Sequence, residues 1–125
     1  MFQKNSLVMR VARQQIESTY TDTCTVIEHQ KTKVNGVTKF ADVPTHEDQP
    51  CRLSFKTITQ GKQSETVTNI DQVTKLFISP DITIKEGSKI VIERDGNTLE
   101  FKSSGIPAIY ATHQEILLDA FKGWS

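Results

Sequence analysis

The stretch 81-DITIKEGSKIVIERDGNTLEFKS-103 decides the fold class, because apolar residues recur at every second position across two turn signals. A period of two places side chains on one face of a β-strand. Glu86-Gly87 and Asp95-Gly96 are turn dipeptides, since glycine readily adopts the positive φ of tight turns. The stretch predicts strand, turn, strand, turn, strand. The inward-facing residues are Ile82, Ile84, Ile90, Ile92, Leu99 and Phe101.

The segments before this stretch also alternate. Asn35-Gly36 predicts a type I′ hairpin, since both central positions of that turn need positive φ. "PCRLSFKT" (50–57) predicts a strand with Cys51, Leu53 and Phe55 on one face. "QVTKLFISP" (72–80) predicts another, ended by a proline that cannot donate to a β-ladder.

The two ends of the chain differ from its middle. Residues 1–19 predict a helix, because Leu7, Val8, Val11, Ala12 and Ile16 fall on one helical stripe, with Asn5 or Ser6 as N-cap and Arg10 and Arg13 on the flank. Residues 107–121 predict a last strand that kinks or becomes helical near Leu117.

With 125 residues, the chain has the size of one domain. We therefore expect a mainly β protein, a small antiparallel β-barrel or sandwich spanning residues 20–125, with an N-terminal helix. A long polar loop is expected at about 57–72, between two strands.

The charge balance offers no general attraction to nucleic acid or to a membrane. Fifteen basic and fifteen acidic residues give a net charge of zero. No apolar run approaches the ~20 residues of a membrane span, and the first residues lack the apolar core of a signal peptide. We expect synthesis in the cytoplasm and no membrane partner.

Motifs for chemistry are not evident. His29, His46 and His113 share no metal-ligand spacing with Cys24 or Cys51. Both cysteines fall on the apolar phase of their strands, where a free thiol behaves as a small hydrophobe. We expect no disulfide, no enzyme activity, and no catalytic, cofactor-binding or metal-binding residues; the alternative is a cysteine hydrolase using Cys24 or Cys51 with His113.

The aromatic residues bear on a second alternative, a small β-barrel nucleic-acid-binding module. Such a module needs a basic groove with exposed rings. The lysines are spread along the chain, and strand alternation puts Tyr110 and His113 on opposite faces. Tyr110 and Trp124 are the plausible exposed rings, since four phenylalanines mostly follow the core phase: Phe40, Phe55, Phe77 and Phe101.

Four stretches carry a family resemblance: "YTDTCTV" (20–26), "QPCRLSF" (49–55), "TKLFISPDITIKEGSKIVI" (74–92) and "PAIYATHQEILLDAFKG" (107–123). With the leading "VARQQIE", they resemble the head-closure, or head–tail connector, proteins of long-tailed bacteriophages and prophage remnants. The resemblance covers nearly the whole chain. Its most specific parts are P-C-R-L-S and Y-x-x-H-Q-E-I.

The resemblance implies a structural role in virion assembly. Such proteins are small β-barrels that form a homo-oligomeric ring at the virion neck, beneath the portal and its adaptor protein. They close the DNA-filled capsid and join it to a tail-completion or tail-terminator protein. Genomic DNA would be channel content alone, and the host cytoplasm would be the site of assembly.

The polar segment 57–72 then becomes a candidate channel loop. A long segment with few large apolar residues cannot bury enough apolar surface to offset its own ordering entropy, but it can order by pairing with copies of itself around a ring. We expect it to face either the channel or a neighbouring subunit. The residues of this loop are Thr59, Gln60, Lys62, Gln63, Glu65, Thr66, Thr68 and Asn69.

Three further residues are candidates for partner contact. Arg10 and Arg13 belong either to a solvated helix flank or to a contact with a phosphate or an acidic partner. Trp124 either packs onto the barrel with Phe121 or anchors a neighbouring protein, since Trp is enriched at interfaces.

Overall fold

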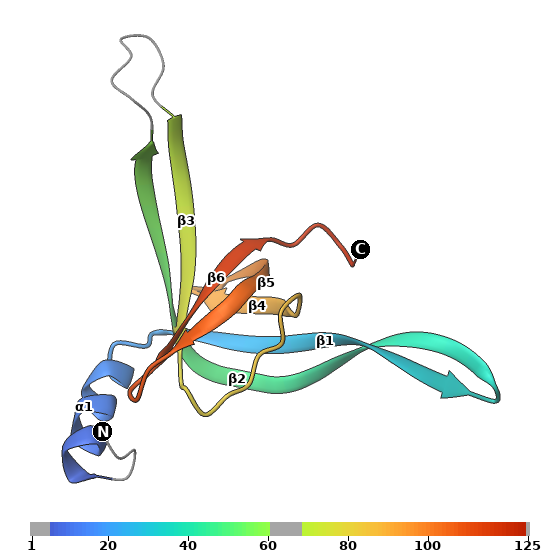
Figure 1. The fold of residues 1–125 in the computed structure, drawn as a ribbon, viewed down its shortest axis with the longest axis horizontal. Coiled ribbons are helices and arrows are strands. Elements are labelled where there is room, and N and C mark those ends of the chain that lie inside the picture. The colour runs from blue at the N-terminus through green and yellow to red at the C-terminus, as the bar shows by residue number, and fades with distance from the viewer. Residues whose placement is uncertain (1–5, 61–68, 125) are drawn as a thin grey trace.

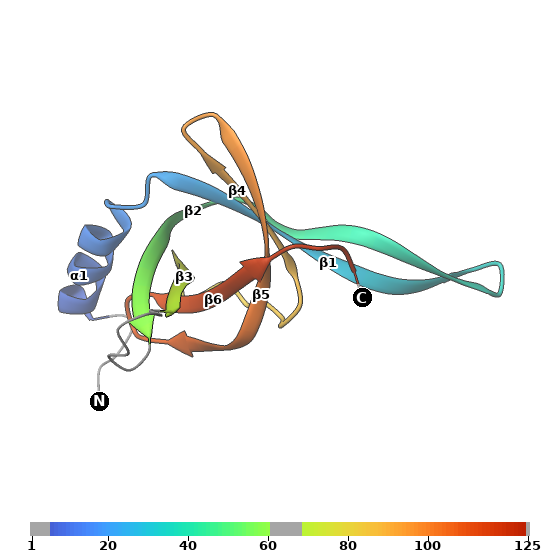
Figure 2. The same cartoon turned by 90° about the horizontal axis from the view of Figure 1, so that it is seen from above.

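The computed structural model describes residues 6–60 and 69–124, with the backbone alone for 57–60 and 69–71. Within these residues, one helix precedes six antiparallel strands, which close into a barrel in the order β1-β2-β3-β6-β5-β4 (Figures 1 and 2). The predicted fold class is thereby confirmed. The elements are α1 (Leu7–Glu17), β1 (Asp22–Val34), β2 (Val37–Gln60), β3 (Asn69–Ile78), β4 (Lys89–Arg94), β5 (Asn97–Ile109) and β6 (Gln114–Ala120).

Strands β1, β2 and β3 are longer than the barrel wall that they help to form. β1 pairs with β4 over Thr23–Ile27, and β3 pairs with β6 over Thr74–Ile78. β2 passes from β1 to β3 at Cys51, which pairs with both. The surplus lengths leave the barrel as two antiparallel ribbons: the β1–β2 arm (residues 28–43) and the β2–β3 arm (residues 56–60 and 69–73) (Figure 1).

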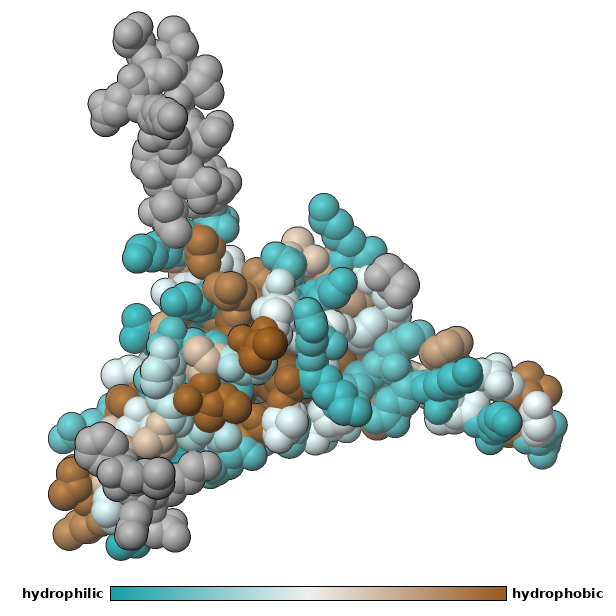
Figure 3. All heavy atoms as spheres, in the orientation of Figure 1, coloured by the Kyte–Doolittle hydropathy of each residue, from teal (hydrophilic) through white to brown (hydrophobic). Residues whose placement is uncertain are grey.

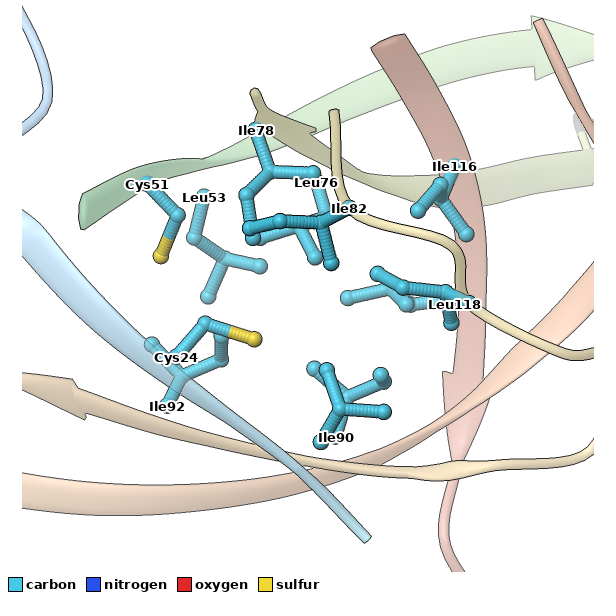
Figure 4. Close-up of a cluster of buried hydrophobic side chains, with 12 residues drawn as sticks. Cys24, Cys51, Leu53, Leu76, Ile78, Ile82, Ile90, Ile92, Ile116 and Leu118 are labelled. Atoms are coloured by element: carbon cyan, nitrogen blue, oxygen red, sulfur yellow. The ribbon is translucent and has the colours of Figure 1, made fainter. Parts of the chain in front are cut away.

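The barrel interior is filled by side chains from every strand. Figure 4 shows Cys24 and Cys51 pointing inward beside aliphatic residues, which confirms their expected place in the core. Leu99 and Phe101 pack against this cluster from a half-buried position. The buried core consists of Cys24, Val26, Cys51, Leu53, Leu76, Ile78, Ile82, Ile84, Ile90, Ile92, Ile116 and Leu118.

Two predicted hairpin turns are confirmed. Asn35 and Gly36 have φ of 52° and 79°, and Asp95 and Gly96 have φ of 50° and 80°. Positive φ at both central positions is what a two-residue hairpin turn of type I′ requires.

The expected strand at Asp81–Ile84 is wrong. After Pro80 the chain crosses one end of the barrel as an irregular segment, with Ile82 and Ile84 still buried. The buried Gln114 amide replaces ladder hydrogen bonds here. It donates to the Ser79 carbonyl at 2.7 Å and to the Ile82 carbonyl at 2.5 Å.

The expected single strand at 107–121 is also wrong, as is its helical alternative. β5 runs to Ile109, the chain turns, and β6 begins at Gln114, with the Tyr110 N–H donating to the His113 carbonyl at 2.8 Å. The Tyr110 and His113 rings consequently stack with centroids 4.9 Å apart, rather than lying on opposite faces. A turn separates them, so strand alternation does not apply.

The boundaries 57–72 of the expected polar loop were too wide. Thr57–Gln60 pairs with Asn69–Gln72 in the β2–β3 arm, since threonine and isoleucine favour a strand once a partner strand is opposite. Residues 61–68 lie outside the described part of the chain.

Two phenylalanines expected on the core phase are exposed. Phe40 is 60% exposed and Phe55 is 46% exposed. Phe40 belongs to the β1–β2 arm, and Phe55 lies where β2 leaves the barrel, so the alternation continues past the point where a core exists.

Helix α1 begins as expected, with the Ser6 hydroxyl accepting from the Met9 N–H at 3.1 Å. Its apolar stripe is buried less than predicted. Leu7, Val8 and Val11 are exposed, whereas Ala12 and Ile16 are half-buried against the barrel. The helix thus leaves part of its apolar face exposed among the described residues.

Adjacent residues of β6 give a matched test of the barrel. Ile116 is 1% exposed and Leu117 is 48% exposed. Ile116→Ala should lower the free energy of unfolding by about 2–5 kcal/mol, because it leaves a core cavity. Leu117→Ala should cost less than about 1 kcal/mol. Urea unfolding measures both, and similar losses for the two variants would contradict the barrel register.

Candidate functional site

The candidate functional features are surfaces around the barrel rather than a catalytic cleft. Hydrophobic residues gather between the base of the β2–β3 arm and α1, and hydrophilic ones cover much of the β1–β2 arm (Figure 3). Among the side chains that the structure describes, the most exposed apolar one is Ile106 on β5, at 94%, with Ile109 and Leu117 on the same pair of strands. Contiguous exposed apolar surface is typical of protein–protein contacts.

A groove lies within this apolar surface. It has a volume of about 240 Å³ and is lined by Ile106, Tyr110 and Leu117 around a Lys75–Glu115 ion pair of 3.2 Å. The His113 ring hydrogen-bonds to the second carboxylate oxygen of Glu115 at 3.0 Å. The hydrogen bond with His113 lowers the pKa of Glu115 below its ordinary value, and it contributes more than the interaction with Lys75.

Arg13 connects α1 to the barrel. Its guanidinium donates to Glu17 at 3.0 Å within the helix, and to Ser79 at 2.6 Å and Asp81 at 2.7 Å on the segment that crosses the barrel end. The hydrogen bond to Asp81 is the main cause of the raised pKa of Arg13. Arg10, on the same helix, is exposed.

The contact between α1 and the barrel is loose apart from this arginine. A hollow of about 480 Å³ lies between them, lined by Ala12, Ile16, Tyr20, Phe77 and His113 among others. Burial raises the pKa of the Tyr20 phenol to about 12, so this side chain stays neutral at physiological pH. The position of α1 therefore depends strongly on one polar network.

The C-terminal tail packs against the β1–β2 arm. Trp124 stacks on His29 with centroids 4.8 Å apart, and His29 stacks on Phe40 at 4.9 Å. The His29 Nδ1 lies 2.9 Å from an Asp42 carboxylate oxygen, and this hydrogen bond lowers the pKa of Asp42. Phe121 packs edge-on against Trp124 at 5.1 Å.

The cysteines do not have the environment of a nucleophile. Both are free and fully buried. A hydrogen bond with Cys24, and then burial, raises the pKa of the Cys51 thiol. A reactive cysteine instead needs a lowered pKa and access to solvent.

In residues 6–60 and 69–124, no three His, Cys, Asp or Glu side chains gather as metal ligands would. None of the helices in that part of the chain has the length and apolarity to cross a bilayer.

The predicted site residues end up in different places. Thr59, Gln60 and Asn69 belong to paired strands of the β2–β3 arm. Arg13 and Trp124 make contacts within the subunit, as described above. Five residues of the predicted channel loop lie outside the described residues: Lys62, Gln63, Glu65, Thr66 and Thr68.

Sequence reasoning missed the local positive charge of the β1–β2 arm. No carboxylate occurs between His29 and Ala41, a segment that contains Lys31, Lys33 and Lys39. The signal was available, because the two-residue turn at Asn35-Gly36 sets the pairing of Thr32 with Lys39 and so brings the three lysines onto one ribbon.

Comparison with known proteins returned one structural similarity. No family model matches the chain, and no curated protein matches it. The phage-like element PBSX protein xkdH from Bacillus subtilis is 14% identical, with a TM-score of 0.49. The match covers 79% of this chain and 93% of that one. At this level of similarity, the function must be argued from the chain itself.

The role of Arg13 in holding α1 can be tested against its neighbour. Arg13→Gln should weaken the docking of α1 by about 0.5–1 kcal/mol, because its partners are partly exposed. Amide hydrogen exchange in Val8–Ile16 should then become about two- to fivefold faster. Arg10→Gln is the matched control and should leave the exchange rates unchanged. Equal acceleration by both would contradict the proposed connection.

The stack at Trp124 should respond to acid through Asp42. The pKa of Asp42 in the folded chain lies below its ordinary value of 3.8, so the ionised carboxylate stabilises the folded contact at pH values above 3.8. This contribution is lost as the pH falls through the folded-state pKa. Trp124, the single tryptophan, should keep its emission from pH 7 to about 4 and change below that.

Asp42→Asn should abolish this acid step, whereas Glu115→Gln, which removes the other His–carboxylate pair, should retain it. Far-UV circular dichroism at each pH identifies global unfolding. An acid step that is unchanged in Asp42→Asn would exclude the carboxylate as its cause.

Proposed function

We propose that the protein is a structural connector of the phage neck, which acts by assembly with copies of itself and with neighbouring proteins, and not by catalysis. The observation that carries this proposal is the pair of ribbons that leave a closed barrel. Two-stranded ribbons are only marginally stable in water, so arms of this length are suited to being completed by contacts with other subunits.

Exposed apolar residues support the same role. α1 presents Leu7 and Val8 to solvent, and β5 and β6 present Ile106, Ile109 and Leu117. Burial of such residues contributes about 1.5–3 kcal/mol each. The two groups lie on different elements, and a head-to-tail contact between identical subunits joins two different surfaces.

The sequence resemblance supplies the specific setting. The P-C-R-L-S run places Cys51 and Leu53 in the core, and the Y-x-x-H-Q-E-I run forms the β5–β6 turn and the start of β6. These motifs thus specify the barrel. We propose that the ring lies at the virion neck, binds a portal-bound adaptor and a tail-completion or tail-terminator protein, and encloses genomic DNA as channel content.

We propose that residues 61–68, which connect the two strands of the β2–β3 arm, face the channel or a neighbouring subunit. Because Gln60 pairs with Asn69, residues 61–68 can be replaced by an Asn-Gly turn that preserves the pairing of the arm. The shortened chain should fold with the wild-type unfolding midpoint. A replacement of equal length with Gly and Ser is the control for the loss of sequence alone.

Electron microscopy of particles tests the proposal. Wild-type chain should appear as a ring at the neck of DNA-filled particles. Particles assembled with the shortened chain should keep the ring and lose packaged DNA or tails. A wild-type chain found elsewhere in the virion, or absent from it, would overturn the connector; full infectivity with the shortened chain would overturn the assignment of the segment.

A further inference from the structure

The β1–β2 arm has a strong local charge in a chain that has none overall. Lys31 and Lys33 lie on one face of the ribbon, and Lys39 lies on the other, opposite Thr32. All three are exposed, and none forms an ion pair with any described residue. We call Lys31, Lys33 and Lys39 the basic arm.

The opposite charge gathers on the outer side of the barrel. Glu93 on β4 pairs with Thr23 of β1. Two residues further along β1, the Thr25 hydroxyl accepts a hydrogen bond from the Asp48 N–H at 3.3 Å. Asp95 occupies the adjoining β4–β5 turn, and Glu100 lies across from Val91 on the same outer side. We call Asp48, Glu93, Asp95 and Glu100 the acidic face.

The acidic carboxylates are not neutralised to the same degree. Glu100 forms an ion pair with Lys89 at 3.1 Å. Glu93 accepts from the Thr98 hydroxyl at 2.8 Å, and among the described residues no cation pairs with Asp48, Glu93 or Asp95. The acidic face therefore keeps most of its negative charge, as the basic arm keeps its positive charge.

The two surfaces cannot satisfy each other easily within one subunit. Figure 2 shows the β1–β2 arm and the β4–β5 hairpin leaving the barrel in different directions. A second copy offers the missing complement, because every subunit carries both surfaces. Contact between two different surfaces of identical chains is head-to-tail, and a ring results when the rotation closes.

We infer that the basic arm of one subunit binds the acidic face of the next copy of this chain. The inference rests on the proposed function, since it names the contact that would set the spacing of the ring. Val34, Val37 and Phe40 on the arm add exposed apolar area to the contact.

Nucleic acid fits the two surfaces less well. Three lysines would attract a phosphate backbone, but the four carboxylates would have no role there, and the net charge is zero. Phe40, the aromatic ring of the arm, already stacks on His29 and on that side is not open to a base. A second copy uses both charged surfaces.

Charge reversal with complementation tests the contact. The arm variant carries Lys31→Glu, Lys33→Glu and Lys39→Glu. The face variant carries Glu93→Lys and Glu100→Lys, with Asp48→Asn and Asp95→Asn, because asparagine tolerates the positive φ at those two positions. The arm variant lowers the net charge by as much as the face variant raises it. The control variant reverses three exposed cations that lie outside the proposed contact surfaces: Arg52→Glu, Lys85→Glu and Lys122→Glu.

Zero-length carbodiimide coupling detects the contact even when it is weak. Mixed ¹⁴N- and ¹⁵N-labelled chains at millimolar concentration and low salt distinguish links between subunits from links within one. In the wild type, links should join the basic arm to the acidic face of another copy, and 1 M salt should remove them. Circular dichroism verifies the fold of every variant.

Each charge-reversed variant alone should give a yield of links between subunits that is at least about tenfold lower, because like charges then face each other. An equimolar mixture of the arm and face variants should restore them, since each chain then offers what the other requires. The control variant should link as the wild type does. Absence of wild-type links at low salt, or failure of the mixture to restore them, would overturn the inference.

Three further outcomes separate the inference from the proposed function. If duplex DNA binds the wild type but not the arm variant, and no links between subunits form, the arm is a nucleic-acid surface and the inference fails. If the chain forms a neck ring while the links are absent, the inference fails and the connector stands. If the links form while the chain is absent from the neck, only the connector fails.

Discussion

The length of the barrel wall is the constraint on which the rest of the structure depends. The barrel closes through the pairing of β1 with β4 at Thr23–Ile27 and of β3 with β6 at Thr74–Ile78. Strands that extend beyond these pairings must leave the barrel together with the neighbour to which they remain bonded. The arms are therefore a consequence of the strand register at which the barrel closes. They do not form a separate folding unit.

Both arms begin on a packed barrel. The interior is filled with aliphatic side chains, and polar groups hold its ends. At one end the buried Gln114 amide fixes the crossing segment, to which Arg13 also attaches α1. At another point, the buried Asp22 accepts from the Leu53 N–H at 3.0 Å and lies beside Arg94 at 3.7 Å. These contacts hold the ends of the barrel from which α1 and the two arms extend.

Local signals predicted what depends on neighbours in sequence. The turns at Asn35-Gly36 and Asp95-Gly96 and the inward phase of Ile90 and Ile92 were all visible in the chain. The position at which the barrel closes was not, because it depends on partners that are remote in sequence. For that reason Phe40 and Phe55 continue the apolar alternation outside any core. The candidate surfaces were the least predictable, since the lysines look dispersed until the hairpin register brings them together.

Charge and apolar area would have different roles in a ring of these subunits. At physiological salt, attraction between exposed charges is screened beyond about 8 Å. Surface ion pairs contribute about 0–1 kcal/mol each, whereas complementary charges suppress wrong arrangements and fix the register of a contact. The basic arm and the acidic face would then select the neighbour and its orientation. The affinity would come mainly from the apolar residues that α1, β5 and β6 leave exposed, so a free subunit could remain monomeric and associate only where a template brings copies together.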